Sequence, residues 1–309
     1  MNERFFEPFV DAVDGVMCVS AAADAADIAG QSAPHGLRFP LLLQGDVPLS
    51  EQVAASAFAP ASSRFGPYCD NITGMNWELP DGRRVRIGER VVKSTTGYDL
   101  LRFLIGTGTR FGRPLDYVLR LRPACDGGGM FSLHGSPESL ETAAAEILRS
   151  SFLHWFESVD WIGGNGEPWL RVGVHCPQME WTVFADFLSS LAERHGLTLQ
   201  TAPGDGQAID GLPDLVLKTA PDRVIPLARK IANDSGVRCI ALCYCAAVHV
   251  YLPDGSNFLE RITALVEPEA ISLNAIGGDW HSRHVEPPNP CAEESAWIET
   301  LEKEWSIPA

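Results

Sequence analysis

The sequence predicts an α+β fold with two main domains. Its 309 residues are about twice the usual length of a domain, and 45% of them are hydrophobic, as in ordinary globular proteins. Strand-like and helix-like segments alternate with short turns after residue 129, which favours an antiparallel sheet with helices on one face. We expect domains over residues 1–124 and 125–280, followed by a loop and an acidic helix over 281–309.

The elements of the first domain are predicted from local patterns. Residues 24–43 indicate a short helix, a turn and a strand, and residues 47–60 are compatible with a helix. Residues 71–93 alternate polar and hydrophobic side chains around Pro80-Asp81-Gly82, which is typical of a β-hairpin. The remaining segments are a short apolar helix within 95–112, a strand in 116–124 and a linker in 125–129.

The second domain has a regular strand and helix rhythm. Ser136 is placed to cap a helix over 136–151, and Gly196 to end a helix over 177–196. The glycine-rich run at 163–166 lies between strand-like segments, so it predicts a hairpin turn. Further helices are expected at 221–236, 256–266 and 292–309, and strands at 130–135, 152–163, 168–176, 197–202, 214–220 and 270–276. Residues 237–252 predict two short strands or one bent strand.

The charge balance restricts the class of partner. The chain has 40 acidic and 24 basic residues, a formal charge of −16, which argues against general binding to nucleic acid or anionic membranes. No apolar run is long enough for a membrane span, and the acidic N-terminus does not resemble a signal peptide. We therefore expect a cytoplasmic protein without a membrane span.

Cysteine and histidine spacing predicts no metal site. Cys239, Cys243 and Cys245 form the one cysteine cluster, but no matching second pair follows it. In an apolar strand Cys243 and Cys245 would point to one face as small buried side chains, and all eight cysteines are expected to be reduced. His281 and His284 could ligate a metal, although an exposed loop is the simpler interpretation.

One stretch carries a specific motif. Residues 53–123 contain the pattern R-x-G-x-x-x-D-x-x-x-G, then the hairpin, then Gly97-Tyr98-Asp99-Leu100 and a series of spaced glycines. This order resembles the FAD-linked oxidases of the vanillyl-alcohol-oxidase (PCMH) type, with most likeness to the E subunits of bacterial glycolate oxidase. The resemblance implies a partial PCMH-type FAD-binding domain followed by a ferredoxin-like α+β cap domain.

The resemblance also implies a cofactor, a reaction and partners. The chain would be a flavoprotein subunit that oxidises 2-hydroxy acids with FAD, in a complex with a larger flavoprotein and an iron–sulfur subunit. Glycines would allow the backbone to approach the flavin and its diphosphate. The positions that match the family pattern as FAD-binding residues are Ala54, Ala55, Arg64, Gly66, Asp70, Gly74, Lys93, Gly97, Tyr98, Gly106, Gly108 and Gly112.

Three departures from the family pattern keep an alternative open. A glycine-rich diphosphate loop is missing, so roughly the first quarter of the family's chain is expected to be absent. Glu51-Gln52 replace a Gly-Gly pair, and Phe58-Ala59 replace Ser-Gly. A carboxylate beside the diphosphate is unfavourable, and a phenyl ring would intrude on the cofactor. The chain could therefore be a degenerate paralogue that binds no FAD and has a structural or assembly role.

The candidate residues also have simpler interpretations. The glycines could shape the turns whether or not flavin binds, and Lys93 and Asp99 could form an ordinary surface pair. No catalytic base is assigned, although His175, His249, His281 and His284 are residues to screen. Residues 81–122 have ten basic and four acidic side chains, a local charge of +6. This segment is either a solvated hairpin face or a surface that meets a diphosphate or an acidic partner.

Overall fold

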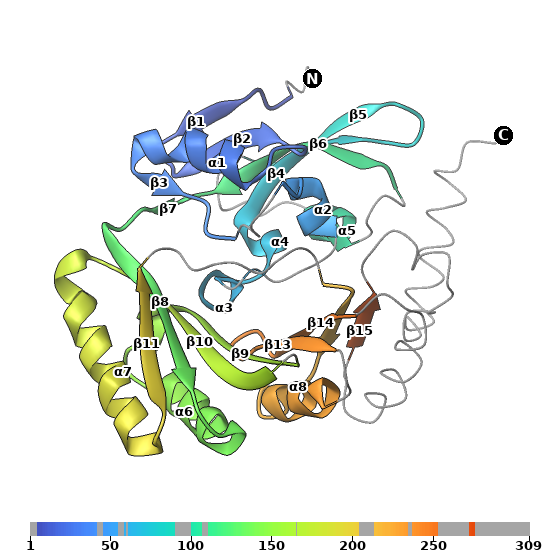
Figure 1. The fold of residues 1–309 in the computed structure, drawn as a ribbon. Coiled ribbons are helices and arrows are strands. Elements are labelled where there is room, and N and C mark those ends of the chain that lie inside the picture. The colour runs from blue at the N-terminus through green and yellow to red at the C-terminus, as the bar shows by residue number, and fades with distance from the viewer. Residues whose placement is uncertain are drawn as a thin grey trace. The chain divides into compact units, whose positions relative to one another are not determined.

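The structure, a computed structural model, divides into two compact units (Figure 1). Among the described residues, the first unit contains 5–54 and 67–124, and the second contains 59–66 and 125–275. Residues 59–66 thus group with the second unit, although in sequence they lie between the two segments of the first unit. The segment 281–309, expected as a loop and helix, lies outside the described residues. Those residues are 5–41, 46–54, 59, 61–89, 100–106, 111–164, 166–203, 213–233, 237–252 and 272–275.

The first unit contains a five-stranded sheet in the order β1-β2-β6-β4-β5, with all neighbours antiparallel. Buried apolar side chains of neighbouring strands, including Val16, Cys18 and Val118, pack with Phe6. A separate two-stranded ladder pairs β3 with β7. The strands are β1 (Phe9–Asp11), β2 (Val16–Ser20), β3 (Leu37–Arg38), β4 (Ile72–Glu78), β5 (Arg84–Gly88), β6 (Arg113–Arg120) and β7 (Arg122–Pro123).

The predicted hairpin is confirmed. Strands β4 and β5 pair around Pro80-Asp81-Gly82, and Gly82 has a φ of 79°, a conformation that glycine adopts without strain. The Leu79 amide donates to the Arg83 carbonyl at 2.8 Å and closes the turn. Local alternation and turn chemistry were sufficient to predict this element.

Short helices connect the strands of the first unit. They are α1 (Ala25–Ser32), the 3-10 turn η1 (Ala33–His35), α2 (Leu49–Ala54), α4 (Tyr68–Asn71) and α5 (Leu100–Gly106). Asp24 caps α1, because its side chain accepts a hydrogen bond from the Asp27 amide while Asp27 accepts one from the Asp24 amide. The short apolar helix that the sequence predicts before β6 is confirmed, as α5.

The second unit is built on an eight-stranded antiparallel sheet in the order β11-β8-β10-β9-β13-β14-β12-β15. Each half has the strand order 4-1-3-2 of a ferredoxin-like sheet, and the halves join where β9 pairs with β13. The strands are β8 (Gly127–His134), β9 (Phe156–Gly164), β10 (Gly166–Cys176), β11 (Thr198–Pro203), β12 (Leu215–Lys218), β13 (Arg238–Leu242), β14 (Ala247–Tyr251) and β15 (Ser272–Ala275).

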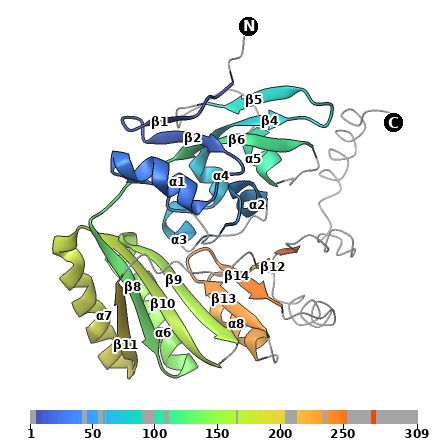
Figure 2. The same cartoon turned by 45° about the horizontal axis from the view of Figure 1, so that its top comes forward.

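Three helices cover one face of this sheet, α6 (Pro137–Arg149), α7 (Trp181–His195) and α8 (Val224–Ala232) (Figures 1 and 2). They share one apolar core with alternate strand residues such as Trp161, Val172 and Val248. The 3-10 turns η2 (Leu153–Trp155) and η3 (Gln178–Glu180) precede β9 and α7. The predicted single sheet with helices on one face is confirmed.

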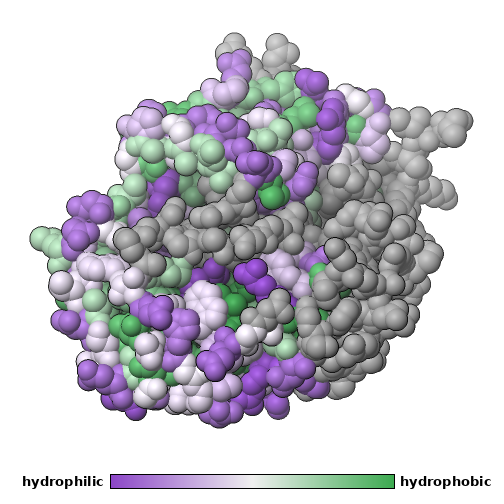
Figure 3. Space-filling model, in the orientation of Figure 1, coloured by the Kyte–Doolittle hydropathy of each residue, from purple (hydrophilic) through white to green (hydrophobic). Residues whose placement is uncertain are grey.

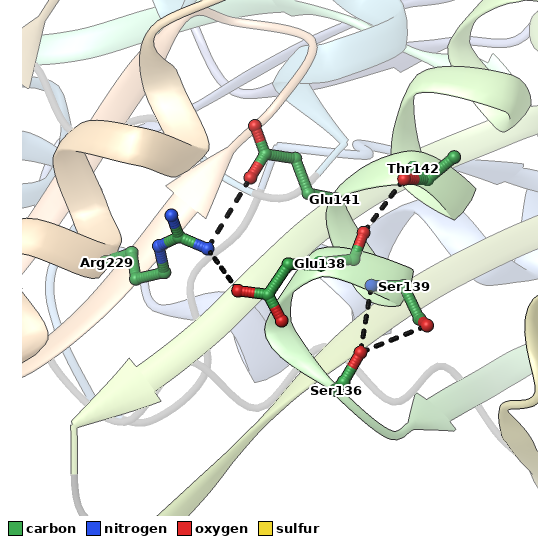
Figure 4. Close-up of polar contacts among 6 residues, drawn as sticks. All are labelled: Ser136, Glu138, Ser139, Glu141, Thr142 and Arg229. Carbon is green, nitrogen blue, oxygen red and sulfur yellow. Dashed lines mark hydrogen bonds and ion pairs between the residues drawn. The ribbon is translucent and has the colours of Figure 1, made fainter.

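The predicted helix ends in this unit are also confirmed. The Ser136 hydroxyl accepts a hydrogen bond from the Ser139 amide at 3.2 Å and caps α6 (Figure 4). Gly196 ends α7 in the left-handed conformation. Figure 4 also shows Arg229 of α8 between Glu138 and Glu141 of α6. Its Nη1 lies 3.2 Å from Glu138 Oε1 and 3.9 Å from Glu141 Oε2, so these ion pairs link a helix of one ferredoxin-like half to a helix of the other.

Two local predictions are wrong. Residues 125–129 were expected as a linker, but Gly127–Gly129 belong to β8 and pair with β10. Glycine is needed there because a Cβ on Gly127 would lie 2.6 Å from the Cα of Gln178. Cys243 and Cys245 do not share a strand face, because the turn between β13 and β14 begins at Cys243. Cys243 is buried and Cys245 is half-buried, and the seven described cysteines are free thiols.

Candidate functional site

The structure separates the motif that suggested FAD binding. Arg64 lies on α3 (Ser62–Phe65) within the second unit, and its guanidinium faces Glu157 of β9 at 3.7 Å. Gly66 ends α3 with a φ of 80°, and its amide donates to the Ser62 carbonyl. Asp70 and Gly74 lie in the first unit. The two halves of one sequence pattern therefore contribute to different cores.

The described residues of the first unit that match the pattern contact the protein itself. Asp70 of α4 forms an exposed ion pair with Arg102 of α5 at 2.5 Å. A Cβ on Gly74 of β4 would lie 2.9 Å from two ring carbons of Phe6. Ala54 and Gly106 are the last residues of α2 and α5, and Ala54 is exposed.

Gly112 has the clearest structural requirement. Its φ is 118°, and a Cβ there would lie 2.1 Å from the Glu78 carbonyl oxygen and 2.6 Å from the Trp77 indole nitrogen. That indole N–H donates to the carbonyl of Phe111 at 2.9 Å. Gly112 therefore allows the chain to approach the end of β4 closely, which is a structural role independent of any ligand.

The Glu51-Gln52 departure is also explained by packing. Gln52 is fully buried, its amide donates to the Val47 carbonyl at 2.8 Å, and its Oε1 accepts from the Tyr68 hydroxyl at 3.0 Å. Burial raises the pKa of Tyr68, so the hydroxyl stays a donor. Glu51 is exposed beside it. Gln52 thus satisfies buried polar groups where the family pattern has a glycine.

These observations test the fit of the chain to FAD. At Gly74 and Gly112 the space that a Cβ would take is filled by the chain's own atoms, so packing within the protein explains both glycines. Ala55, Lys93, Gly97, Tyr98 and Gly108 lie outside the described residues, as does Phe58.

Several arginines of the basic segment pair with acidic side chains of the same unit. Glu78 faces both Arg84 and Arg113, at 3.5 and 2.5 Å. The hydrogen bond from Arg113 lowers the pKa of Glu78. Arg83 pairs with Asp81, and Arg86 pairs with Glu89. These contacts favour the interpretation of a solvated hairpin face over that of an anion-binding surface, and Figure 3 shows hydrophilic side chains at the surface.

A different group of charged residues is buried in the second unit. Asp160 of β9 and Arg171 of β10 pair across the strands, on the sheet face opposite the three helices. Both guanidinium nitrogens Nε and Nη2 donate to the same carboxylate oxygen, Oδ2, at 3.0 and 2.8 Å. The exposed fractions of the two side chains are 0% for Asp160 and 2% for Arg171. We call Asp160, Arg171 and His249 the charged cluster.

The second carboxylate oxygen of Asp160 is left without a hydrogen bond. Oδ1 is buried and accepts none from the described residues. The Ser158 hydroxyl is close enough to favour the ionised carboxylate, but it makes no hydrogen bond of normal geometry to it. Burial raises the pKa of Asp160 to about 6, although the adjacent Arg171 acts to lower it. This carboxyl therefore titrates close to neutral pH.

His249 of β14 completes the charged cluster from the other ferredoxin-like half. It is fully buried, and burial together with the positive charge of Arg171 lowers its pKa to about 3. A histidine with this pKa is neutral at pH 7 and is a weak base. Ile162 and Ile240, which pair across the junction of the halves, are buried apolar residues on the strands between Arg171 and His249.

Helix α3 packs on β9 beside this cluster and brings further polar groups. Arg64 faces Glu157, and its guanidinium lies 5.0 Å from the Phe65 ring centre and 6.0 Å from that of Trp155. Ser62 is buried, and its hydroxyl has no hydrogen-bond partner among the described residues. Two buried polar atoms, Ser62 Oγ and Asp160 Oδ1, are thus unsatisfied on contacting elements.

The screened histidines separate by role. His175 contacts the start of the 125–275 segment of the second unit, because its Nε2 accepts a hydrogen bond from the Cys125 amide at 3.0 Å. His249 is in the charged cluster, and His281 and His284 lie outside the described residues. The cluster itself was missed. A signal was present, since Asp160 and Arg171 are charged residues inside apolar strand-like runs, at comparable distances from the predicted hairpin turn.

The described residues contain neither a cluster of metal-ligating side chains nor a helix suited to a membrane. Within them, no three histidine, cysteine, aspartate or glutamate side chains come together as a metal site. Among the helices that the structure describes, none combines the length and apolar character needed to cross a bilayer.

Solved structures with the same fold are those of alkyldihydroxyacetonephosphate synthase. One has a TM-score of 0.66 at 9% identity, over 96% of this chain and 63% of that chain. A second crystal form gives a TM-score of 0.64 at 11% identity, over 98% and 66%. At this identity the likeness establishes the fold, an α+β fold of the FAD-binding PCMH type, as predicted.

Sequence comparison gives shorter matches, and no protein-family model matches the chain. An FAD-linked oxidoreductase of Mycobacterium tuberculosis is 28% identical over 119 residues, 38% of this chain and 26% of that protein. The mitochondrial cytochrome-type D-lactate dehydrogenase of Arabidopsis thaliana is 32% identical over 88 residues, 28% of this chain and 16% of that protein. The matched stretches thus cover about a quarter or less of these relatives. The chain is similar in sequence to FAD-linked oxidoreductases and shares the PCMH-type fold.

Proposed function

We propose that the chain is a subunit of an FAD-linked oxidoreductase that oxidises 2-hydroxy acids, resembling the glycolate oxidase E subunit. The observation that carries this proposal is the combined similarity, to FAD-linked oxidoreductases in sequence and to the PCMH-type fold over nearly the whole chain. D-Lactate, in the name of one relative, is itself a 2-hydroxy acid. That resemblance supports the proposed substrate class.

FAD would be the oxidant in this proposal. When bound, a flavin accepts two electrons from the substrate. The described glycines and Arg64 serve the protein's own packing, so contacts to the flavin would come from Ala55, Lys93, Gly97, Tyr98 and Gly108. A partner subunit would share the cofactor site. We assign no base to the reaction on this basis.

The proposed setting is a cytoplasmic complex with a larger flavoprotein and an iron–sulfur subunit. We retain residues 1–124 as the flavin-binding part, 125–280 as the cap and 281–309 as a C-terminal segment. A second candidate is a paralogue without FAD that has an assembly role. It is favoured by one observation, that Gln52 and Tyr68 fill a position which is glycine in the family pattern.

Spectroscopy of the purified chain separates the two candidates. A bound flavin gives visible absorbance, and added FAD should be taken up by chain that has lost it. Reduction of a dye by glycolate or D-lactate then tests the substrate class. If the chain neither absorbs in the flavin bands nor binds FAD, alone or after co-purification with partner subunits, the flavoprotein proposal is wrong and the assembly role stands.

A further inference from the structure

The turn between β13 and β14 contains two cysteines, Cys243 and Cys245, which are separated by Tyr244. Cys243 is buried, with 2% of its surface exposed, whereas Cys245 is half-buried. The Cys245 amide donates to the Leu242 carbonyl at 3.0 Å, so the chain bends at this point. One buried sulfur and one that solvent can reach therefore lie within a three-residue segment.

Covalent geometry keeps these cysteines within the range of a disulfide. Cα atoms two residues apart are separated by at most about 7 Å in an extended chain, and by less in a turn. Disulfide-bonded cysteines have Cα atoms roughly 4.4–6.8 Å apart. Neighbouring strands hold the turn at both ends. The Cys243 amide donates to the Val159 carbonyl of β9 at 3.1 Å, and the Thr219 amide, directly after β12, donates to the Ala246 carbonyl at 3.0 Å. A bond between the two sulfurs needs no cavity for a bound molecule.

The backbone directly after the second cysteine is strained. Ala246 has a φ of 50°, and it is the one residue other than glycine with a positive φ in the part of the chain that the structure describes. This conformation is unfavourable for a residue with a Cβ, and such residues cluster at functional sites and switches. A disulfide closed within three residues adds strain, and strained disulfides are readily reduced. The turn is therefore suited to a bond that forms and breaks reversibly.

The surroundings of the turn give the two cysteines different roles. Burial raises the pKa of Tyr244, and the positive charge of Arg64 acts to lower it, so the guanidinium lies near the residue between the cysteines. A nearby cation favours a thiolate, which is the nucleophilic form of cysteine. Burial raises the pKa of Cys243, so this thiol keeps its proton at pH 7. The half-buried Cys245 is therefore the attacking thiol and Cys243 the resolving one.

We propose that Cys243-Tyr244-Cys245 is a redox-active dithiol, which a low-molecular-weight disulfide such as oxidised glutathione converts reversibly to a Cys243–Cys245 disulfide. The Cys245 thiol loses its proton and attacks one sulfur of the small disulfide, whose S–S bond breaks, and the first glutathione leaves as a thiolate that takes up a proton. Cys243 then loses its proton, attacks the Cys245 sulfur and releases the second glutathione. The two protein thiols lose two electrons and two protons in total, and the oxidant gains them as two thiols.

Alkylation and mass spectrometry of one tryptic peptide test this assignment on the purified full chain. Residues 239–261 form a single tryptic peptide that contains Cys239, Cys243 and Cys245. In the reduced chain all three cysteines should be alkylated after denaturation. After incubation with oxidised glutathione only Cys239 should be alkylated, and the peptide should have lost two hydrogen atoms and carry no glutathione. Dithiothreitol should restore alkylation of all three.

Three variants separate the roles of the cysteines. Cys239→Ala, in the same peptide, is the matched control and should still form the disulfide. Cys245→Ser should leave Cys243 reduced, because the oxidant does not reach a buried thiol. Cys243→Ala should stop at the mixed disulfide between glutathione and Cys245. Thermal unfolding shows whether each variant is folded, and Cys245→Ser, at the half-buried position, keeps the test decisive if Cys243→Ala does not fold.

The same measurements can overturn the proposal. Three alkylated cysteines after oxidation, a glutathione that stays on Cys245 in the wild type, or a disulfide that is lost in Cys239→Ala would each do so. None of these measurements depends on flavin, so their outcome is separate from the test of the proposed function.

Discussion

Ion pairs between carboxylates and arginines occur in opposite surroundings in two regions of the molecule. On the hairpin of the first unit, Glu78 lies between Arg84 and Arg113, whose side chains are 59% and 66% exposed. In the second unit Asp160 and Arg171 are almost completely buried. The distances are similar, at 2.5 to 3.5 Å on the hairpin and 2.8 Å in the sheet.

Water explains why these pairs differ in effect. On the hairpin, water and salt screen the charges, so each pair contributes little to stability. In the sheet, the same attraction acts with much less screening, but each charge has lost its hydration. The distance between paired charges is therefore a poor guide to their contribution to stability. Burial decides how much stability is lost when one partner is removed.

The largest expected effect comes from leaving the buried carboxylate alone. Arg171→Met removes the cationic partner that the described residues provide for Asp160, and it should lower the free energy of unfolding at pH 7 by roughly 3–5 kcal/mol. The loss should be smaller at pH 5, where Asp160 can take up a proton. Urea denaturation at both pH values measures this.

The control is the exposed arginine replaced in the same way. Arg113→Met should leave the urea midpoint almost unchanged. The double variant Asp160→Leu/Arg171→Met should regain most of the stability lost in Arg171→Met, because no buried charge remains. A double variant as unstable as the single one would mean that packing, and not charge, explains the loss.

The next effect concerns glycines that the FAD pattern also predicts. Gly112→Ala should cost about 1–3 kcal/mol from overlap with the Glu78 carbonyl, in addition to backbone strain of about 1–2 kcal/mol. Gly82→Ala, also at positive φ but with nothing within 4 Å, should cost the strain alone. Chemical denaturation of the FAD-free chain compares them. Equal losses would show that Gly112 has no packing role.

A smaller effect is expected from pH. His249 has a folded pKa of about 3 against about 6.5 unfolded, so its contribution is complete above pH 6.5 and is lost as pH falls through that range. Asp160 acts in the opposite sense, because its raised pKa adds stability as pH falls through 6. His249→Gln should therefore lose about 1–2 kcal/mol less than wild type between pH 7 and pH 5. Unfolding curves at pH 7, 6 and 5 measure the slope, and an unchanged slope would contradict the burial of an uncharged histidine.

The smallest effect is expected at Glu78, the partly exposed carboxylate of the hairpin. Glu78→Gln removes the partner of two arginines, yet the urea midpoint should not change measurably at physiological salt, because water solvates the freed guanidinium groups. Repeating the measurement at low salt is the sharper comparison. A loss as large as that of Arg171→Met would remove the distinction between the two regions.

Sequence reasoning succeeded where the determining interactions are local. Pro80-Asp81-Gly82 specifies the hairpin turn, Ser136 caps α6 and Gly196 ends α7, all through contacts within a few residues. It failed at Gly127–Gly129, where glycine implied a linker but the close approach of Gln178 requires it inside a strand.

The candidate site was predicted less well, because its chemistry depends on distant pairing. Arg64 and Asp70 are close in one motif, yet one faces Glu157 and the other faces Arg102. Their partners lie 93 and 32 positions away in sequence, which no local pattern encodes. Asp160 and Arg171 become a pair only through the register of β9 and β10.

The sequence by itself determined the α+β class, the antiparallel sheet with helices on one face, and most turns and helix ends. These follow from hydrophobic period and from the backbone preferences of a few residues. Only the tertiary structure decided which charges are in water and which are not. Asp160 and Arg171 come from one ferredoxin-like half and His249 from the other, so the three residues share a sheet face only in the assembled sheet.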